Sequence, residues 1–172
     1  MNKHIFIING SGGVGKDTFV SLVTVQMSNE TSCVPATINY SSVDKIKEMA
    51  KMVGWNGGKS EKDRKFLSDL KFLCSEYNDI PFRSLEETVD VFNKSDSLIL
   101  FLHIREPKEI ERAVDTFGAK TILIKRDAVR PITSNAADGN VLNYDYDIVI
   151  ENNGTLADLE QTVIQFVARY CT

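Results

Sequence analysis

The fold of this chain is set by the stretch Ile5-Phe6-Ile7-Ile8-Asn9-Gly10-Ser11-Gly12-Gly13-Val14-Gly15-Lys16-Asp17-Thr18. Its first four residues are apolar and predict a buried strand, and a helical pattern of apolar residues follows from Phe19 to Met27. Between them, glycines allow successive backbone N–H groups to turn inward around an anion, and the amino end of the helix adds a positive dipole. Lys16 can then reach the outer phosphates of a ligand as a mobile charge.

Strand, glycine loop, lysine and helix in this order are the layout of a phosphate-binding loop, the P-loop or Walker A motif. A purely structural glycine turn is the alternative, and the strand before and the helix after the loop disfavour it. We therefore expect ATP to be bound by Gly10, Ser11, Gly12, Gly13, Val14, Gly15, Lys16, Asp17 and Thr18.

Asp17 departs from the usual pattern, in which Ser or Thr follows the lysine and holds Mg²⁺ through its hydroxyl. A carboxylate at the end of a phosphate loop repels a triphosphate unless a cation lies between them. We expect Asp17 to bind Mg²⁺, directly or through water, or to pair with a nearby cation.

The composition suits one α/β domain that spans residues 1–172, with 42% hydrophobic and 26% charged residues. A net charge of −4 gives no electrostatic footprint for nucleic acid, so no nucleic-acid partner is expected. No apolar run approaches the roughly 20 residues that cross a membrane, and the glycine loop occupies the place of a signal peptide. Cys33, Cys74 and Cys171 match no metal or redox spacing and predict reduced thiols in a cytoplasmic protein. The oligomeric state is left open.

Apolar patterning along the chain predicts alternating strands and helices. The expected strands cover residues 3–8, 33–40, 97–104, 121–124 and 147–150, and the expected helices cover 16–28, 43–53, 61–78, 84–94, 106–117 and 155–170. Ser41 and Ser42 are expected to cap the second helix, Ser60 with Asp63 the third, and Thr155 the last. This order predicts a three-layer α/β fold with a five-stranded, mainly parallel sheet.

Two segments are longer than their connections require. Residues 41–94 exceed a simple crossover between strands and predict an inserted helical flap rather than a separate domain. Residues 126–143 are polar and predict a short lid, although an ordinary solvated loop is the alternative. Arg126 and Arg130 are four residues apart, and on a closing lid they would stabilise transition-state charge.

Two further arginines are candidates for binding the acceptor. Arg105 follows a strand, at the edge of the sheet where ligands bind, and it could reach a phosphate or pair with Glu106 or Glu109. Arg64 can grip a phosphate in a bidentate manner, although a basic helix is commonly just a solvated face. His103 stands where many P-loop enzymes carry an acid that orients Mg²⁺, and we expect it to be a hydrogen-bonded structural residue.

At Gly15-Lys16-Asp17-Thr18 the chain resembles the GKDT ending of the P-loop in phage-type deoxynucleoside monophosphate kinases, and animal-type phosphomevalonate kinases have a similar GKD. Residues 40–49, with Gly54-Trp55, are similar to the segment that opens the monophosphate-binding region of those kinases. Residues 104–109 resemble their strand-end pattern DVRFPNE, with His103 in place of its Asp. Residues 147–156 resemble the closing strand and turn that border the adenine.

The resemblance implies a P-loop NTPase fold of the nucleoside monophosphate kinase type and an ATP- and Mg²⁺-dependent kinase. The acceptor it implies is a small phosphorylated molecule, foremost a nucleoside or deoxynucleoside monophosphate. Ser41 would then belong to the acceptor site, and Asn153 would border the adenine. The alternatives are a small-metabolite kinase of the phosphomevalonate kinase type and a nucleotide-binding protein with little or no kinase activity.

Overall fold

A computed structural model describes residues 2–30, 36–129 and 141–171. Its centre is a five-stranded sheet in the order β2-β3-β1-β4-β5, and every neighbouring pair of strands is parallel. The strands are β1 (His4–Asn9), β2 (Thr37–Ser41), β3 (Ile99–His103), β4 (Lys120–Lys125) and β5 (Ile148–Glu151). The predicted fold class is confirmed.

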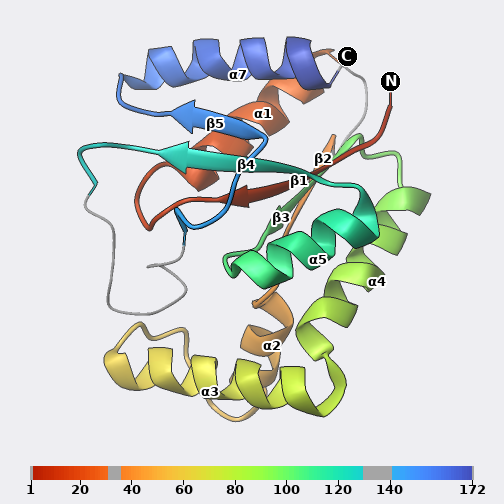
Figure 1. Cartoon of the computed structure of the whole chain (residues 1–172), viewed down its shortest axis with the longest axis vertical. Helices are drawn as coiled ribbons and strands as arrows, with labels where there is room; N and C mark the ends of the chain where they lie inside the picture. The colour runs from red at the N-terminus through yellow and green to blue at the C-terminus, as the bar shows by residue number, and fades with distance from the viewer. Residues whose placement is uncertain (1, 31–35, 130–140, 172) are drawn as a thin grey trace.

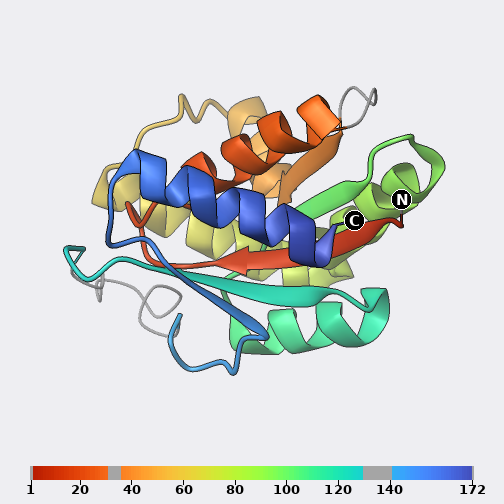
Figure 2. The ribbon, with the colours of Figure 1, turned by 90° about the horizontal axis from the view of Figure 1, so that it is seen from above.

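Helices cover both faces of the sheet and make the fold three-layered (Figure 1, Figure 2). The helices α1 (Lys16–Glu30) and α7 (Leu156–Tyr170) pack on one face, and α4 (Ile80–Lys94) and α5 (Pro107–Phe117) pack on the other. Side chains of β1 alternate between these layers, because successive residues of a strand point to opposite faces. Phe6 packs against Phe166 of α7 with ring centroids 5.1 Å apart, whereas Ile7 joins the cluster on the α4 and α5 side.

The helices α2 (Asp44–Met52) and α3 (Glu61–Asn78) extend beyond the sheet at the bottom of Figure 1. Of residues 41–94, which were expected to form a flap, those of α4 pack on the sheet, and α2 and α3 project from it. Two ion pairs join the α3 end of this projection to α5: Lys71 with Glu109 at 2.8 Å, and Asp79 with Arg112 at 2.6 Å. Asp79 links α3 directly to α4 and has a left-handed φ of 50°.

The ends of the helices test the predicted caps. Ser60 with Asp63 and Thr155 with Asp158 form complete capping boxes, as expected. The expectation that Ser41 or Ser42 caps α2 is wrong, because the chain stays in strand conformation through Ser41.

Val43 is the residue at the N-cap of α2, and within the described residues it makes no side-chain capping bond. The Asp44 carboxylate accepts a hydrogen bond from the Ser41 N–H at 2.9 Å. The helix α4 begins at Ile80 rather than at the expected Ser84, since Pro81 is well tolerated in a first turn.

The cysteines within the described part of the chain, Cys74 and Cys171, are buried free thiols, and Cys33 lies outside it. Burial raises the pKa of Cys171 to about 12, so this thiol stays protonated at neutral pH. Among the helices that the structure describes, none combines the length and the apolar character needed to cross a membrane.

Candidate active site

A cavity of about 1370 Å³ lies between the carboxyl ends of β1, β2 and β3 and the projecting helices α2 and α3. Ligands of open parallel sheets bind at this edge. The glycine loop, the strand ends and α3 each contribute to its wall, which includes Asn9, Gly12, Gly13, Lys16, Asp17, Asn39, Ser41, Asp44, Arg64, Lys65, Lys71, His103 and Arg105.

Two glycines of the loop are fixed by what lies beside them. A Cβ atom at Gly10 would come within 2.5 Å of the carbonyl oxygen of Ile124, and one at Gly15 within 2.5 Å of Asn152 Nδ2. Both residues also have φ values, 146° and 99°, that L side chains rarely adopt. At Gly10 the loop therefore passes too close to the backbone of β4 for a side chain, and at Gly15 the positive φ disfavours one that would also displace the Asn152 amide.

The Lys16 side chain folds back over the glycine loop. Its ammonium group donates hydrogen bonds to the carbonyl oxygens of Gly10 at 2.5 Å and Ser11 at 3.0 Å. It therefore lies at the mouth of the loop and on the wall of the cavity, where a ligand phosphate could compete for it.

Asn9, the last residue of β1, connects the start of the loop to two other segments. Its side chain is 1% exposed. Its Oδ1 accepts from the Gly10 N–H at 2.8 Å, and its Nδ2 donates to Tyr146 Oη at 2.8 Å and to the Arg105 carbonyl at 3.3 Å. Tyr146 in turn donates to the carbonyl of Val141, and burial raises the pKa of Tyr146 to about 12. This hydroxyl therefore remains a donor at neutral pH.

Asn152 and Asn153 connect the far side of the loop to the end of β4. Asn152 Nδ2 donates to the Val14 carbonyl at 2.9 Å. Asn153 is exposed, and its side-chain amide exchanges two hydrogen bonds with Asp127, at 2.8 and 2.9 Å. Sequence reasoning missed Asn9, Asn152 and Tyr146, although an Asn directly after an apolar run was the available signal for Asn9.

His103, at the end of β3, behaves as the structural residue that was expected. Its Nε2 lies 2.6 Å from Asn39 Oδ1, and because a carbonyl oxygen only accepts, Nε2 carries the proton. Burial lowers the pKa of His103, against the opposing charges of Asp17 and Asp44. The ring is therefore neutral at neutral pH and stands beside the glycine loop.

Asp17 is exposed in the first turn of α1 and lines the cavity. Within the described part of the chain, no three His, Cys, Asp or Glu side chains are grouped so that they could hold a metal ion. Mg²⁺ does not require such a group, since it commonly binds one or two carboxylates together with ligand phosphates and water. Asp17 therefore fits Mg²⁺ that arrives with a nucleotide.

The wall opposite the loop is rich in cations. Arg64 is exposed on α3, where its Nε donates to the Lys59 carbonyl at 3.2 Å. Lys65 pairs with Asp69 at 2.8 Å, and Glu109, one of the two carboxylates considered for Arg105, pairs with Lys71. Arg105 itself is exposed and lines the cavity from the end of β3. The structure thus brings Arg64, Arg105 and Ser41, the three residues proposed from the sequence for the acceptor, to one cavity.

The remaining predicted residues take other places. Val14 is buried in the core under the loop. Among the described residues, the cavity wall does not include Thr18, Asn153 or Arg126, which is exposed after β4. Arg130 lies outside the described residues, as do residues 131–140 of the predicted lid.

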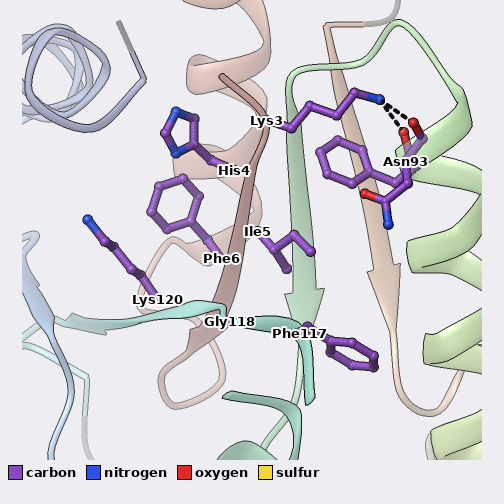
Figure 3. A pocket seen from close by; sticks show the side chains of 9 residues that line it. Lys3, His4, Ile5, Phe6, Asn93, Phe117, Gly118 and Lys120 are labelled. Atoms are coloured by element: carbon purple, nitrogen blue, oxygen red, sulfur yellow. Dashed lines mark hydrogen bonds between the residues drawn. The ribbon is translucent and has the colours of Figure 1, made fainter. Parts of the chain in front are cut away.

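A smaller cavity of about 270 Å³ lies at the amino ends of β1 and β4 (Figure 3). Its polar side chains do not converge. Lys3 points to one side of β1, where its ammonium donates to the carbonyls of Phe92 at 2.6 Å and Asn93 at 3.1 Å. His4 and Lys120 lie on the other side of the strand. Lys3 therefore caps the end of α4, and the larger cavity is the candidate active site.

Comparison with known proteins identifies the fold. No protein-family model and no curated protein matches the chain. The crystal structure of TT1252 from Thermus thermophilus is similar, with 16% identity over 100% of both chains and a TM-score of 0.57.

Two further structures are similar at comparable identity. The tunicamycin resistance protein of Deinococcus radiodurans has 14% identity, coverage of 98% of this chain and 95% of its own, and a TM-score of 0.54. The Mycobacterium tuberculosis APS kinase CysC, in complex with AMPPNP and APS, has 12% identity, coverage of 97% and 98%, and a TM-score of 0.51. The chain therefore shares the three-layer α/β fold of these structures, one of which is a kinase.

Proposed function

We propose that this protein is an ATP-dependent kinase that transfers the γ-phosphoryl group to a small phosphorylated acceptor, foremost a nucleoside or deoxynucleoside monophosphate. One observation carries the proposal: the glycine loop and the cationic side chains of α3 face a single cavity of about 1370 Å³. Phosphoryl transfer depends on aligned reactants and on positive charge around the moving group, and a cavity with a glycine loop on one side and cations on the other would favour both.

The donor side is formed by the glycine loop. Its N–H groups and Lys16 would hold the phosphates of ATP, and Asp17 would hold Mg²⁺, which neutralises phosphate charge when bound. Lys16 would leave the carbonyls of Gly10 and Ser11 for the phosphates, because a charge-assisted bond to phosphate is stronger than one to a neutral carbonyl. Arg126 and Arg130, on the predicted lid, are proposed to stabilise the transferring group.

The acceptor side is formed by Arg64, Arg105 and Ser41. The two guanidinium groups come from different walls of the cavity, so a phosphate on the acceptor could bind between them. Ser41 is at the end of β2, where its backbone N–H is fixed by Asp44.

The proposal is tested by ADP release with ATP, Mg²⁺ and a panel of nucleoside and deoxynucleoside monophosphates. We expect turnover with at least one of them and a loss of more than about 100-fold in Lys16→Ala. Arg64→Ala should raise the acceptor KM by about tenfold or more while the ATP KM is unchanged. Lys62→Ala is the matched control, because Lys62 is an exposed cation of α3 outside the cavity wall.

The alternatives give different results in the same assay. Turnover with non-nucleotide phosphates alone would replace the nucleotide acceptor by a small metabolite, as in a kinase of the phosphomevalonate kinase type. ATP binding without turnover of any phosphorylated acceptor would leave a nucleotide-binding protein with little or no kinase activity. Equal effects of Arg64→Ala and Lys62→Ala would reject the proposed acceptor wall.

A further inference from the structure

Asn152 joins the glycine loop to the opposite end of the chain. It is the first residue after β5, and its side chain is buried, with 6% of the residue exposed. Its backbone N–H donates to the Lys125 carbonyl at 2.7 Å, which holds it beside the end of β4. Its side-chain Nδ2 then donates to the Val14 carbonyl at 2.9 Å. The backbone of Asn152 is thus held by the sheet, and its side chain binds the loop.

We propose that Asn152 is a positioning residue, which orients the Val14–Gly15 peptide of the glycine loop so that the loop can bind phosphate. The inference rests on the proposed binding of ATP at this loop. A peptide unit is planar and trans, so its C=O and N–H point in opposite directions. The hydrogen bond directs the Val14 carbonyl toward Asn152, and the Gly15 N–H therefore points away from Asn152.

The orientation needs an external restraint because four of the six residues 10–15 are glycines, Gly15 of this peptide among them. Glycine tolerates positive and negative φ about equally, so the freedom that lets the loop wrap around an anion also lets its peptides rotate. A rotated Val14–Gly15 peptide would present a carbonyl where a phosphate requires an N–H, and a carbonyl dipole repels an anion. The Asn152 amide stabilises one of the two orientations.

The same side chain explains why residue 15 is glycine. A Cβ atom there would meet Asn152 Nδ2 at 2.5 Å, in addition to the strain of a φ of 99°. The Val14 side chain is buried in the core, so the peptide is held from its side chain as well as from its carbonyl. The restraint therefore acts on the Val14–Gly15 peptide and does not involve Gly12 and Gly13.

Calorimetric titration with ATP and Mg²⁺ tests the proposal without knowledge of the acceptor. Asn152→Asp keeps the volume of the side chain but places a carboxylate, which only accepts, against the Val14 carbonyl. We expect ATP to bind about tenfold to one hundredfold more weakly to Asn152→Asp and to Asn152→Ala. Thr121→Ala is the matched control, since Thr121 of β4 is 1% exposed and its replacement removes a partly buried side-chain hydrogen bond to Asp147.

Thermal melting separates positioning from stability. If Thr121→Ala melts as low as the Asn152 variants but binds ATP within about twofold of the wild type, the loss of affinity belongs to Asn152. Wild-type affinity in Asn152→Asp would overturn the role of Asn152 while the wild type still binds ATP. A wild type that does not bind ATP would overturn both this inference and the proposed function.

A measurement on the wild type keeps the inference testable if the variants fail to fold. In ¹⁵N-labelled protein, ATP should shift the amide resonance of Gly15 strongly. Gly54 is the reference, because it is an exposed glycine with φ of 96° that is not part of the cavity wall. A Gly15 amide that moves no more than that of Gly54 would show that its N–H is not directed at the phosphates.

Discussion

Replacement of Asn9 by Ala should remove three hydrogen bonds that hold the start of the glycine loop. The buried Gly10 N–H would lose its acceptor at 2.8 Å, which costs about 1–3 kcal/mol. The bonds to Tyr146 Oη and to the Arg105 carbonyl add about 1 kcal/mol, since the second is long at 3.3 Å. The free energy of unfolding should therefore fall by roughly 2–4 kcal/mol.

For a chain of this length, 1 kcal/mol corresponds to about 2–4 °C in Tm, so Asn9→Ala should melt roughly 5–15 °C below the wild type. Urea denaturation followed by circular dichroism gives the free energy, and calorimetry gives the Tm. Asn93→Ala is the matched control, because Asn93 is exposed on α4, and its change should stay within about 0.5 kcal/mol.

Tyr146→Phe separates the network from the volume of the side chain. It removes the hydroxyl that accepts from Asn9 and donates to Val141. Because Asn9→Ala already breaks one of these bonds, the double variant should be more stable than the sum of the single losses predicts, by about 0.5–1 kcal/mol. Strict additivity, or a loss of less than about 0.5 kcal/mol in Asn9→Ala, would refute the reasoning.

Three further predictions concern His103, the link between α3 and α5, and a helix cap. Burial lowers the pKa of His103, so below about pH 6.5 the unfolded chain binds a proton more readily than the folded chain does. The free energy of unfolding should therefore fall from about pH 7 to pH 5. Urea titrations at these pH values should show a smaller fall for His103→Gln. An unchanged slope would mean that His103 is not responsible. Lys71→Gln should lower the free energy of unfolding by about 0.5–1 kcal/mol, because the ion pair with Glu109 is lost. A variant in which Lys71 and Glu109 are exchanged should recover this stability; no recovery would indicate that packing dominates. Ser60→Ala should cost about 1 kcal/mol and should speed hydrogen exchange first at the amino end of α3; uniform acceleration would argue against a local cap.

The fold could be predicted from the sequence because its signals are local. Continuous apolar runs predicted the buried parallel strands, and β1 is covered on both faces as such a run requires. The capping boxes at Ser60 and Thr155 follow from residues three apart, so they were also visible in the sequence. The N-cap residue of α2 could not be predicted from the sequence, because β2 extends through Ser41 by pairing with β3.

The candidate site could be predicted only in part. Lys16, Asp17 and Arg105 follow strand ends or the glycine loop, and parallel strands bring their carboxyl ends to one edge. Arg126 also follows a strand, yet it is exposed outside the cavity wall, since β4 lies on the other side of β1 from β3 and β2, whose ends line the cavity.

The residues that hold the glycine loop in place could not be predicted, for a different reason. Asn152 and Val14 are 138 residues apart, and Asn9 and Tyr146 are 137 apart. Local patterns carry no information about hydrogen bonds of this separation, because the contact exists only after the sheet has assembled. A single sequence therefore gives more information on which residues line the cavity than on which residues hold the glycine loop in place.

A crystal structure with a non-hydrolysable ATP analogue and Mg²⁺ tests the central claim most directly. We expect the phosphates to lie inside the loop of residues 10–16, with Asp17 near the metal ion. The ammonium of Lys16 should have moved from the carbonyls of Gly10 and Ser11 to the phosphates. Phosphates bound outside the loop, or a Lys16 that keeps both carbonyl bonds in the complex, would contradict the proposed nucleotide site.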